Sequence, residues 1–582
     1  MTKNRFQRNA LFISAGLLSA ASVGAQDSAN PDQAEELAPI QVEGGAVDSA
    51  AQQANQLKRA SPNAVEIIGD DQLNQYNEQA LGDALRRVPS VSFDGANRTR
   101  EIRLRGLPSK YTQVLVNGEP FLGGESNRTI EVDRIPTGLV ERVEVIRSPR
   151  ASQRGQGASG TVNIVLKDGA ELPEQTEITV GAGYLEDTGN LGELGVTHVG
   201  KNGPLSYTFA ASVQQFRRSE TANEFEFDAN RDPDGGKLEF NQRKFEQINL
   251  MPSFQLDLRN GGELSFSPFY TRTKEFRTDI ERKLEDDQQT IKESANEGRV
   301  RPREQFGFQS EWKQSLTQTT DLSLGLNWQE AEVITERTER GFENDVGSDV
   351  SSLKLRDESR DLELIRPEAT LSIDAGRHAL AFGVGAGFKQ HDESNSEVEI
   401  ESGEPVEQKV KGARVFQVNE DVLFGYVEDV WAATDRFRIT GGLRYEQSDT
   451  ETTSFAGDTI SEDVGFVLPS VNAAFDITSQ TQLRAGVSRS VRRPDLRALT
   501  PTIEEKDGVP TDPDEQGNPN QEPESIWGID TGVDHYFAQE RGYVSANAFY
   551  RLFEDKIEQV VFDRDPSSPA DTFTIQPRNV GD

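Results

Sequence analysis

Residues 201–213 read KNGPLSYTFAASV, and this stretch decides the fold class. Residues 201–203 supply a turn, and from Leu205 to Val213 every second residue is apolar. Because successive side chains of a strand point to opposite faces, a period of two gives a strand with one apolar and one polar face. The stretch therefore predicts a turn followed by a strand that is apolar on one side only.

The same period runs from about Thr176 to the end of the chain, interrupted by turns such as residues 260–262 and 374–376. Strands of about 10 residues, joined alternately by short turns and by long acidic loops, are typical of a barrel that crosses a membrane. We expect such loops at 281–297 and 391–411. A secreted β-sandwich is the soluble alternative, but sandwiches do not string together so many long hairpins with unequal loops. Residues 171–582 are therefore predicted to form a transmembrane antiparallel β-barrel, a mainly β fold in outer-membrane lipid.

Composition excludes several other classes. The 582 residues contain 98 Asp and Glu against 62 Lys and Arg, a net charge of −36, and no cysteine. This rules out disulfides and cysteine-ligated metals, and it disfavours nucleic acid as a partner. The four histidines, at 198, 378, 391 and 535, are scattered without metal-ligand spacing. We therefore expect no enzyme, no catalytic residue, no metal and no cofactor.

The first residues have the features of an export signal. Basic residues at 3, 5 and 8 precede an apolar run from Ala10 to Val23, and small residues at 23 and 25 suit a signal peptidase. The run is shorter than the about 20 residues that a membrane-spanning helix needs. Residues 1–25 are predicted to be a signal peptide, and the polar residues 26–59 a flexible leader.

Residues 60–170 have mixed signals that predict a small α+β domain. Helical spacing runs from Leu73 to Arg87 and stops at Pro89. Strands are expected at 102–106, 111–118, 140–146 and 160–167, with a tight turn at Asn117-Gly118. Residues 155–160 (GQGASG) fit the dinucleotide-binding spacing G-x-G-x-x-G, but a strand pattern follows where that site needs a helix. A nucleotide site is therefore not expected.

Motifs in order over nearly the whole chain carry a resemblance to a known family. They are residues 38–44 (APIQVEG), 81–85 (LGDAL), 88–91 (VPSV), 102–106 (IRLRG), 114–120 (VLVNGEP), 135–136 (IP), 140–145 (VERVEV), 425–429 (GYVED), 442–446 (GLRYE), 517–520 (GNPN) and 522–524 (EPE). Together they resemble the TonB-dependent outer-membrane receptors of Gram-negative bacteria. The resemblance implies a barrel of about 22 strands, occluded by an N-terminal plug domain over residues 60–170.

The resemblance also implies a function and partners. A scarce ligand binds from outside and is imported into the periplasm with energy delivered by TonB, which pairs with the TonB box by adding a strand. A ferric siderophore is the first expectation for the ligand, and an oligosaccharide or another bulky nutrient is the alternative. A surface-binding barrel that does not transport is a more distant alternative. Residues 26–37 are too few for the extra domain of a signalling transducer.

Three groups of residues receive roles from the resemblance. The TonB box is expected to bind TonB through Ala38, Pro39, Ile40, Gln41, Val42 and Glu43. Two plug loops are expected to contact the ligand through Asn97, Arg98, Arg100, Glu125, Asn127 and Arg128. Residues 86–154 have a net charge of +5 in an otherwise acidic chain, so plug arginines are expected to face carboxylates of the barrel, namely Arg103, Arg105, Arg142 and Arg147.

The strand count departs from the family. Between Thr176 and the end of the chain the sequence offers about 15 or 16 candidate strands at the length that each needs. The last residues, 578–582 (RNVGD), lack the terminal aromatic residue usual in such barrels. The chain is therefore predicted to lack part of the C-terminal barrel.

Overall fold

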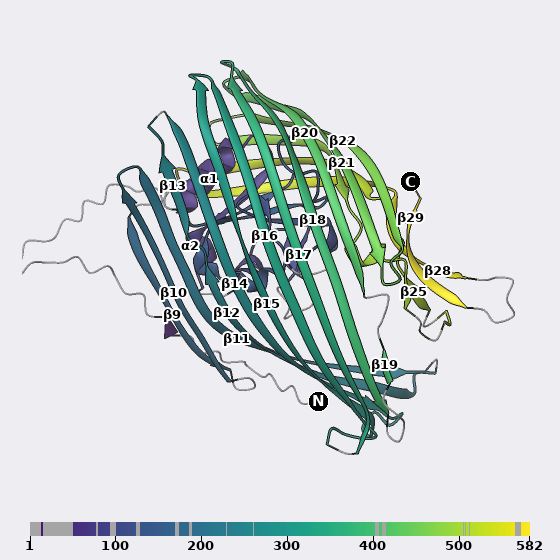
Figure 1. The fold of residues 1–582 in the computed structure, drawn as a ribbon. Coiled ribbons are helices and arrows are strands. Elements are labelled where there is room, and N and C mark those ends of the chain that lie inside the picture. The colour runs from purple at the N-terminus through teal and green to yellow at the C-terminus, as the bar shows by residue number, and fades with distance from the viewer. Residues whose placement is uncertain are drawn as a thin grey trace, which may run out of the picture.

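The computed structural model describes residues 13–14, 50–76, 80–93, 100–123, 128–168, 174–185, 189–228, 230–259, 261–347, 349–401, 407–409, 415–504, 506, 508–510, 513–564 and 572–581. Strands dominate these residues, and a small domain with the helices lies inside their curve (Figure 1). Among the described residues, none of the helices has the length and apolar content to cross a bilayer. The TonB box predicted at 38–44 lies outside the described residues.

The large sheet is a barrel of antiparallel neighbours in chain order from β9 to β27. Its strands are β9 (Gln175–Leu185), β10 (Gly189–Asn202), β11 (Leu205–Phe227), β12 (Pro233–Leu250), β13 (Ser253–Asp257), β14 (Gly262–Leu284), β15 (Ile291–Thr317), β16 (Thr320–Phe342), β17 (Val350–Asp374), β18 (His378–Glu401), β19 (Glu407–Lys409), β20 (Phe416–Thr434), β21 (Phe437–Ser454), β22 (Thr459–Asp476), β23 (Thr481–Arg492), β26 (Glu524–Phe537) and β27 (Gly542–Glu554). β1 (Ile13–Ser14) pairs with β9 from within the predicted signal peptide, so a chain cleaved after Ala25 would lack that pair.

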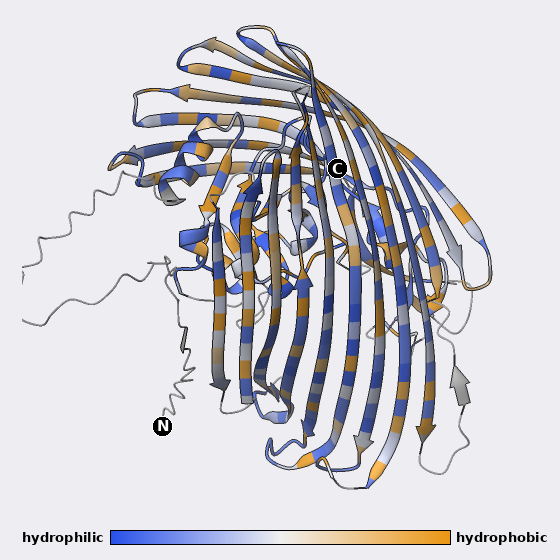
Figure 2. Ribbon diagram, turned by 60° about the vertical axis from the view of Figure 1, so that its left-hand side comes forward, coloured by the Kyte–Doolittle hydropathy of each residue, from blue (hydrophilic) through white to orange (hydrophobic). Residues whose placement is uncertain are grey.

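The period of two appears in the structure as an alternation of exposed and buried side chains along the barrel strands. On β11, Phe209 and Val213 are exposed on the outer face, whereas Thr208 and Ser212 are buried inside. Apolar and polar residues alternate in this way along the barrel strands (Figure 2). The prediction of a strand from Leu205 to Val213 is confirmed, and its apolar face is the one that lipid can cover.

The two ends of the barrel differ in their connections. At one end the turns are short, as between β15 and β16 or between β17 and β18. At the other end the strands extend far beyond what a bilayer needs. The loops predicted at 281–297 and 391–411 are wrong in their extent, because β14 continues to Leu284, β15 begins at Ile291 and β18 continues to Glu401. The paired strands satisfy each other's backbone groups in water as well as in lipid.

A four-stranded sheet lies outside the large one. It consists of β24 (Ile503–Glu504), β25 (Asp514–Gln516), β29 (Phe573–Val580) and β28 (Lys556–Asp563) in that spatial order. β28 follows β27 after a single residue, at the end of the barrel opposite the short turns.

The plug contains a five-stranded sheet in the order β2-β7-β8-β5-β6. Its strands are β2 (Val65–Gly69), β7 (Val140–Ile146), β8 (Gly160–Leu166), β5 (Thr112–Val116) and β6 (Glu119–Pro120), beside a separate pair of β3 (Val91–Phe93) and β4 (Ile102–Leu104). Helix α1 (Ala50–Ala60) precedes β2, and 3-10 turns occupy Ser109–Tyr111, Val132–Arg134 and Thr137–Leu139. The core is fully covered and includes Leu81, Val132, Val143 and Val162. The plug strands expected from the sequence are confirmed.

The helix predicted from Leu73 to Arg87 is wrong. The structure has two short helices, α2 (Asp70–Leu73) and α3 (Leu81–Leu85). Asn74 ends α2 with a backbone bond to the Asp70 carbonyl and a side-chain bond to the Asp70 carboxylate. Ala80 is extended because Leu81 donates its N–H to the Ile135 carbonyl in another segment. Local polar bonds and a tertiary contact therefore override helical spacing.

The glycine-rich segment 155–160 leads directly into a strand. Gly157 and Gly160 have φ values of +92° and +128°, and β8 starts at Gly160. The absence of a following helix agrees with the rejection of a dinucleotide site.

Candidate functional site

A cavity of about 180 Å³ lies between the plug and the barrel, toward the end with the long strands. Its barrel lining comes from β17, β18, β20, β21 and β23, and its plug lining from residues 110–115, 120–123, 128–130 and 154–158. We call it the outer cavity. Eight basic side chains line it, against three acidic ones: Lys110, Arg128, Arg154, Arg366, Lys389, Arg444, Arg492 and Arg493, with Glu420, Glu446 and Asp495.

The acidic groups of the outer cavity orient the basic ones. Arg128 makes a fork with Glu420, with distances of 3.1 and 2.5 Å from its two terminal nitrogens to the two carboxylate oxygens. Glu446 accepts from Arg444 at 2.7 Å and from Arg493 at 2.8 Å. Paired guanidinium groups keep free N–H groups for further acceptors. The outer cavity can therefore bind an anion with several donors held in place.

A second cavity of about 580 Å³ lies on the other side of the plug sheet edge, toward the short turns. We call it the inner cavity. Plug residues of β5 to β8 line one side, and β13 to β17 line the other. Its acidic side chains outnumber its basic ones: Glu119, Glu141, Glu144, Asp168, Glu311 and Glu368 against Arg142, Lys167 and Arg366.

The structure places only some of the predicted ligand residues. Asn97, Arg98, Glu125 and Asn127 lie outside the described residues. Arg128 lines the outer cavity, whereas Arg100 forms an ion pair with Glu131 of the plug and lies beside a small pocket near β11 and β12.

The predicted plug arginines have different surroundings. Arg105 pairs with Asp530 of β26 at 2.7 Å, and burial lowers the pKa of its guanidinium. Arg147 pairs with Glu66 of the plug at 3.2 Å. Arg142 pairs with its plug neighbours Glu141 and Glu144, and Arg103 donates to the carbonyls of residues 106 and 107.

Other plug–barrel contacts were missed by sequence reasoning. Arg150 pairs with Glu428 of β20 at 3.1 Å, and the Ser152 N–H donates to the same carboxylate at 3.0 Å. Glu428 lies in the motif at 425–429, and Arg150 and Ser152 follow shortly after β7, which holds the motif at 140–145. These motifs were a usable signal, although the sequence does not predict which residue pairs with which.

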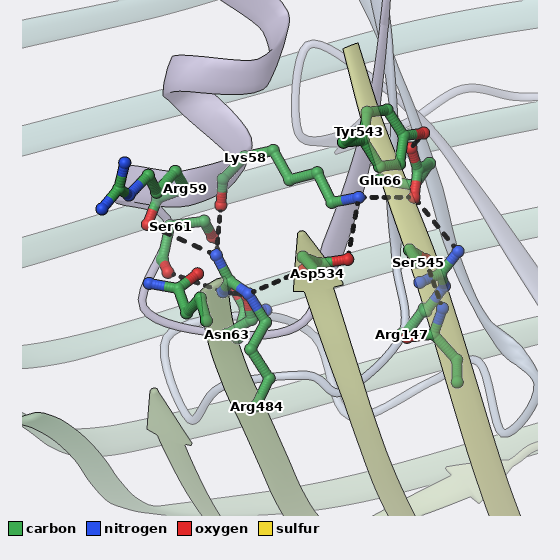
Figure 3. A network of polar contacts seen from close by, with 12 residues as sticks. Lys58, Arg59, Ser61, Asn63, Glu66, Arg147, Arg484, Asp534, Tyr543 and Ser545 are labelled. Carbon is green, nitrogen blue, oxygen red and sulfur yellow. Dashed lines mark hydrogen bonds and ion pairs between the residues drawn. The ribbon is translucent and has the colours of Figure 1, made fainter. Parts of the chain in front are cut away.

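A second missed contact is a buried charge network beside α1 (Figure 3). Lys58, whose side chain is 1% exposed, pairs with Glu66 at 3.1 Å and with Asp534 of β26 at 3.2 Å. Its ammonium lies 3.7 Å from the centre of the Tyr543 ring of β27. Arg484 of β23 donates to the carbonyls of Lys58, Ser61 and Asn63 at the end of α1. We call this network, with Glu66 and Arg147, the α1 clamp.

No group of three or more His, Cys, Asp or Glu side chains suited to a metal ion occurs within the described ranges.

Comparisons with known proteins now decide the family. The model "TonB-dependent Receptor Plug Domain" matches residues 57–162, and the model "TonB dependent receptor-like, beta-barrel" matches residues 197–582. The chain belongs to the TonB-dependent receptors.

Individual relatives of this TonB-dependent receptor are distant in sequence. The iron-regulated outer membrane virulence protein of Vibrio cholerae serotype O1 is 23% identical over 98% of this chain and 75% of that protein. The ferric enterobactin receptor of Pseudomonas aeruginosa is 24% identical over 77% of this chain and 61% of that protein. The crystal structure of a point mutant of the ferric enterobactin receptor PfeA from Pseudomonas aeruginosa is similar to this one, with a TM-score of 0.64 at 18% identity over 92% of this chain and 77% of the solved one. The receptor is thus an outer-membrane β-barrel with a plug.

Proposed function

We propose that this receptor imports a ferric siderophore across the outer membrane with energy delivered by TonB. The observation that carries the proposal is the outer cavity, in which a cluster of guanidinium groups faces the space between plug and barrel. Ferric siderophores present carboxylate, hydroxamate or catecholate oxygens, which forked arginine donors bind well. The names of two relatives, which refer to iron regulation and to ferric enterobactin, support the same ligand class.

The size of the outer cavity limits its part in binding. A volume of about 180 Å³ is below the about 300–1,000 Å³ of sites that enclose a small molecule. In the proposed function the cavity is the floor of a larger site, and the plug loops at 95–100 and 123–128 add further contacts. Arg128, which the sequence singled out, would donate to the ligand from this floor.

TonB is the proposed partner on the periplasmic side. Residues 38–44 would pair with a strand of TonB, because Pro39 prevents a helix and Ile40 and Val42 point to one side of an extended chain. The proposal includes the division into signal peptide (1–25), leader (26–59), plug (60–170) and barrel (171–582), with the correction that residues 50–59 of the leader belong to α1, which packs with the plug. It assigns transport and no catalysis. Because the outer membrane offers no ATP, the energy for transport must come from the inner membrane.

Uptake of labelled iron complexes tests the function. Cells that express the receptor under iron limitation are compared with cells that express Ile40→Pro, and with Ala34→Pro as a matched control in the same leader. The proposal expects that Ile40→Pro abolishes uptake while surface binding persists, and that Ala34→Pro changes neither. Uptake that persists in Ile40→Pro would refute the assignment of the TonB box. Absence of iron uptake in every strain would refute the siderophore and favour the oligosaccharide alternative.

A further inference from the structure

One short plug segment separates the outer and inner cavities. Phe121 lines both, Pro120 lines the outer cavity and Glu119 lines the inner one. We call residues 119–122 the flap. The barrel wall beside it shows the same order: on β17, Leu362 and Leu364 line the outer cavity, Arg366 lines both, and Glu368 and Thr370 line the inner cavity. The two cavities therefore follow one another along one wall, with the flap between them.

The flap is weakly attached to the plug. β6 is the edge strand of the plug sheet, and it pairs with β5 only through Leu115–Pro120 and Val116–Glu119. The turn that joins the two strands, Asn117-Gly118, has φ values of +50° and +80°. Peeling an edge strand of two residues about such a turn breaks few backbone bonds, and of the plug core it disturbs the place where Phe121 packs against it.

Polar and apolar contacts hold the flap to the barrel, where Leu122 packs with Ala331, Leu362 and Leu364. Gln329 of β16 donates to the Pro120 carbonyl at 2.6 Å and accepts from the Leu122 N–H at 3.0 Å. Phe121 contacts Phe269 of β14, with 5.2 Å between the ring centres. Gln329 is fully covered and Phe269 lines the inner cavity, so water reaches these hydrogen bonds only once the flap has begun to move.

Glu119 makes the charged contact of the flap, and its partners are arginines that line the outer cavity and could bind an anion. Glu119 accepts from Arg366 of β17 at 2.5 Å and from Arg154 of the plug at 3.4 Å. Both arginines line the outer cavity. Burial, with the charge of Arg366 next, lowers the pKa of Arg154 to about 9, so its guanidinium remains charged at neutral pH. Glu119 therefore occupies donors that an incoming anion would use.

We propose that Glu119 is a latch that an anionic ligand displaces from Arg366 and Arg154, which releases the flap and joins the outer cavity to the inner cavity along β14 to β17. The inference rests on the proposed function for the class of ligand. It adds that the path opens along β14 to β17, and that displacement of Glu119 by the ligand opens it. Because carboxylates outnumber basic groups in the inner cavity, an anion that has passed the flap meets repulsion there and is favoured to leave toward the periplasm.

A crosslink across the flap tests the path. The chain has no cysteine, so Phe121→Cys with Phe269→Cys can be joined by a short reducible bis-thiol reagent. The matched control is Asp83→Cys with Arg218→Cys, which replaces an ion pair of 2.8 Å between plug and barrel that lines neither cavity. With ferric enterobactin as the probe, the flap crosslink should reduce uptake at least tenfold, leave surface binding intact and be reversed by reductant. The control crosslink should leave uptake within about twofold of its uncrosslinked form.

Two outcomes of the crosslinking would overturn the path. Unchanged uptake with the flap crosslinked excludes movement of the flap, and an equal block by both crosslinks indicates that the plug moves as a whole. Each double variant before crosslinking is its own control for folding and binding.

A measurement on the purified receptor tests the latch without ligand. A nitroxide attached at Phe121→Cys should be immobile in the parent and clearly more mobile with Glu119→Gln. Glu144→Gln, a carboxylate variant in the same inner cavity but outside the flap, should leave the label immobile. A label that stays equally immobile in Glu119→Gln overturns the latch. Since neither transport nor ligand enters this measurement, its failure is distinct from failure of the proposed function.

Discussion

The plug meets the barrel in opposite ways at the two edges of its sheet. At the β2 edge, the α1 clamp buries a lysine, two arginines and two carboxylates against β23, β26 and β27. At the β6 edge, the flap rests on β14 to β17 between two cavities, with a partly exposed carboxylate as its charged contact. The first contact breaks only at high cost, and the second can exchange its partners with water or with an anion.

This difference separates two inputs of the proposed transport cycle. In the proposed cycle, a pull by TonB on the residues before α1 would act first on the clamped edge. The ligand would act at the flap, where it would compete for Arg366 and Arg154. A plug that is firm where force is applied and loose where the ligand binds can respond to both.

The largest effect is expected at the clamp. Lys58→Met removes the cation between Glu66 and Asp534 and leaves two buried carboxylates without it, which costs about 3–5 kcal/mol of unfolding free energy. Guanidinium unfolding of the purified receptor in detergent measures this cost. Arg59→Met, one residue further along α1 with a side chain 26% exposed, is the control and should cost under about 1 kcal/mol. An equal loss of unfolding free energy in the two variants would contradict the claim that the buried ion pairs of the α1 clamp stabilise the receptor more than exposed ion pairs do.

An intermediate effect is expected for Arg484→Lys. The lysine keeps the charge near Asp534 but cannot reach three carbonyls at the end of α1 with a planar fork. We expect a loss of about 2 kcal/mol, from the typical value of hydrogen bonds to a charged group. Arg438→Lys, at a more exposed site with bonds to the carbonyls of residues 59 and 60, should lose less than half as much. The reverse order would show that the end of α1 is held mainly from Arg438.

The smallest effect on stability is expected at the flap. Gln329→Ala removes the bonds to Pro120 and Leu122 at a fully covered site, but these bonds join uncharged groups, so the cost should be about 1 kcal/mol. Hydrogen exchange at the amides of residues 119, 121 and 122 should nevertheless become severalfold faster. Gln305→Ala on the neighbouring strand, which contacts Gln329, should leave that exchange unchanged. A loss of several kcal/mol in Gln329→Ala would show that the flap wall is as firm as the clamp wall.

The sequence predicted the elements of the fold well because their signals are local. The alternation from Leu205 to Val213 depends only on neighbours along the chain, and so does the Asn117-Gly118 turn. The strands of the plug and the barrel followed from such patterns, together with motifs that resemble the family. The helix predicted from Leu73 to Arg87 failed where a contact from Ile135 holds Ala80 extended.

The site depends on contacts that are distant in the chain, and little of it could be predicted. Lys58 and Asp534 are 476 positions apart, and Glu119 and Arg366 are 247 apart. No pattern in the sequence around Lys58, which stands in the predicted leader, indicates that it is the most buried cation of the α1 clamp. The preference for arginines in the plug was visible from charge, but the choice of partner depends on how strands of the barrel wrap around it.

Hydrogen exchange on the unmodified receptor tests the difference between the two edges most directly. The account predicts that the flap amides, those of residues 119, 121 and 122, exchange at least about tenfold faster than those of β2, residues 65–69, because local opening at the flap costs far less free energy than opening at the clamp. Slower exchange at the flap than at β2 would contradict the account.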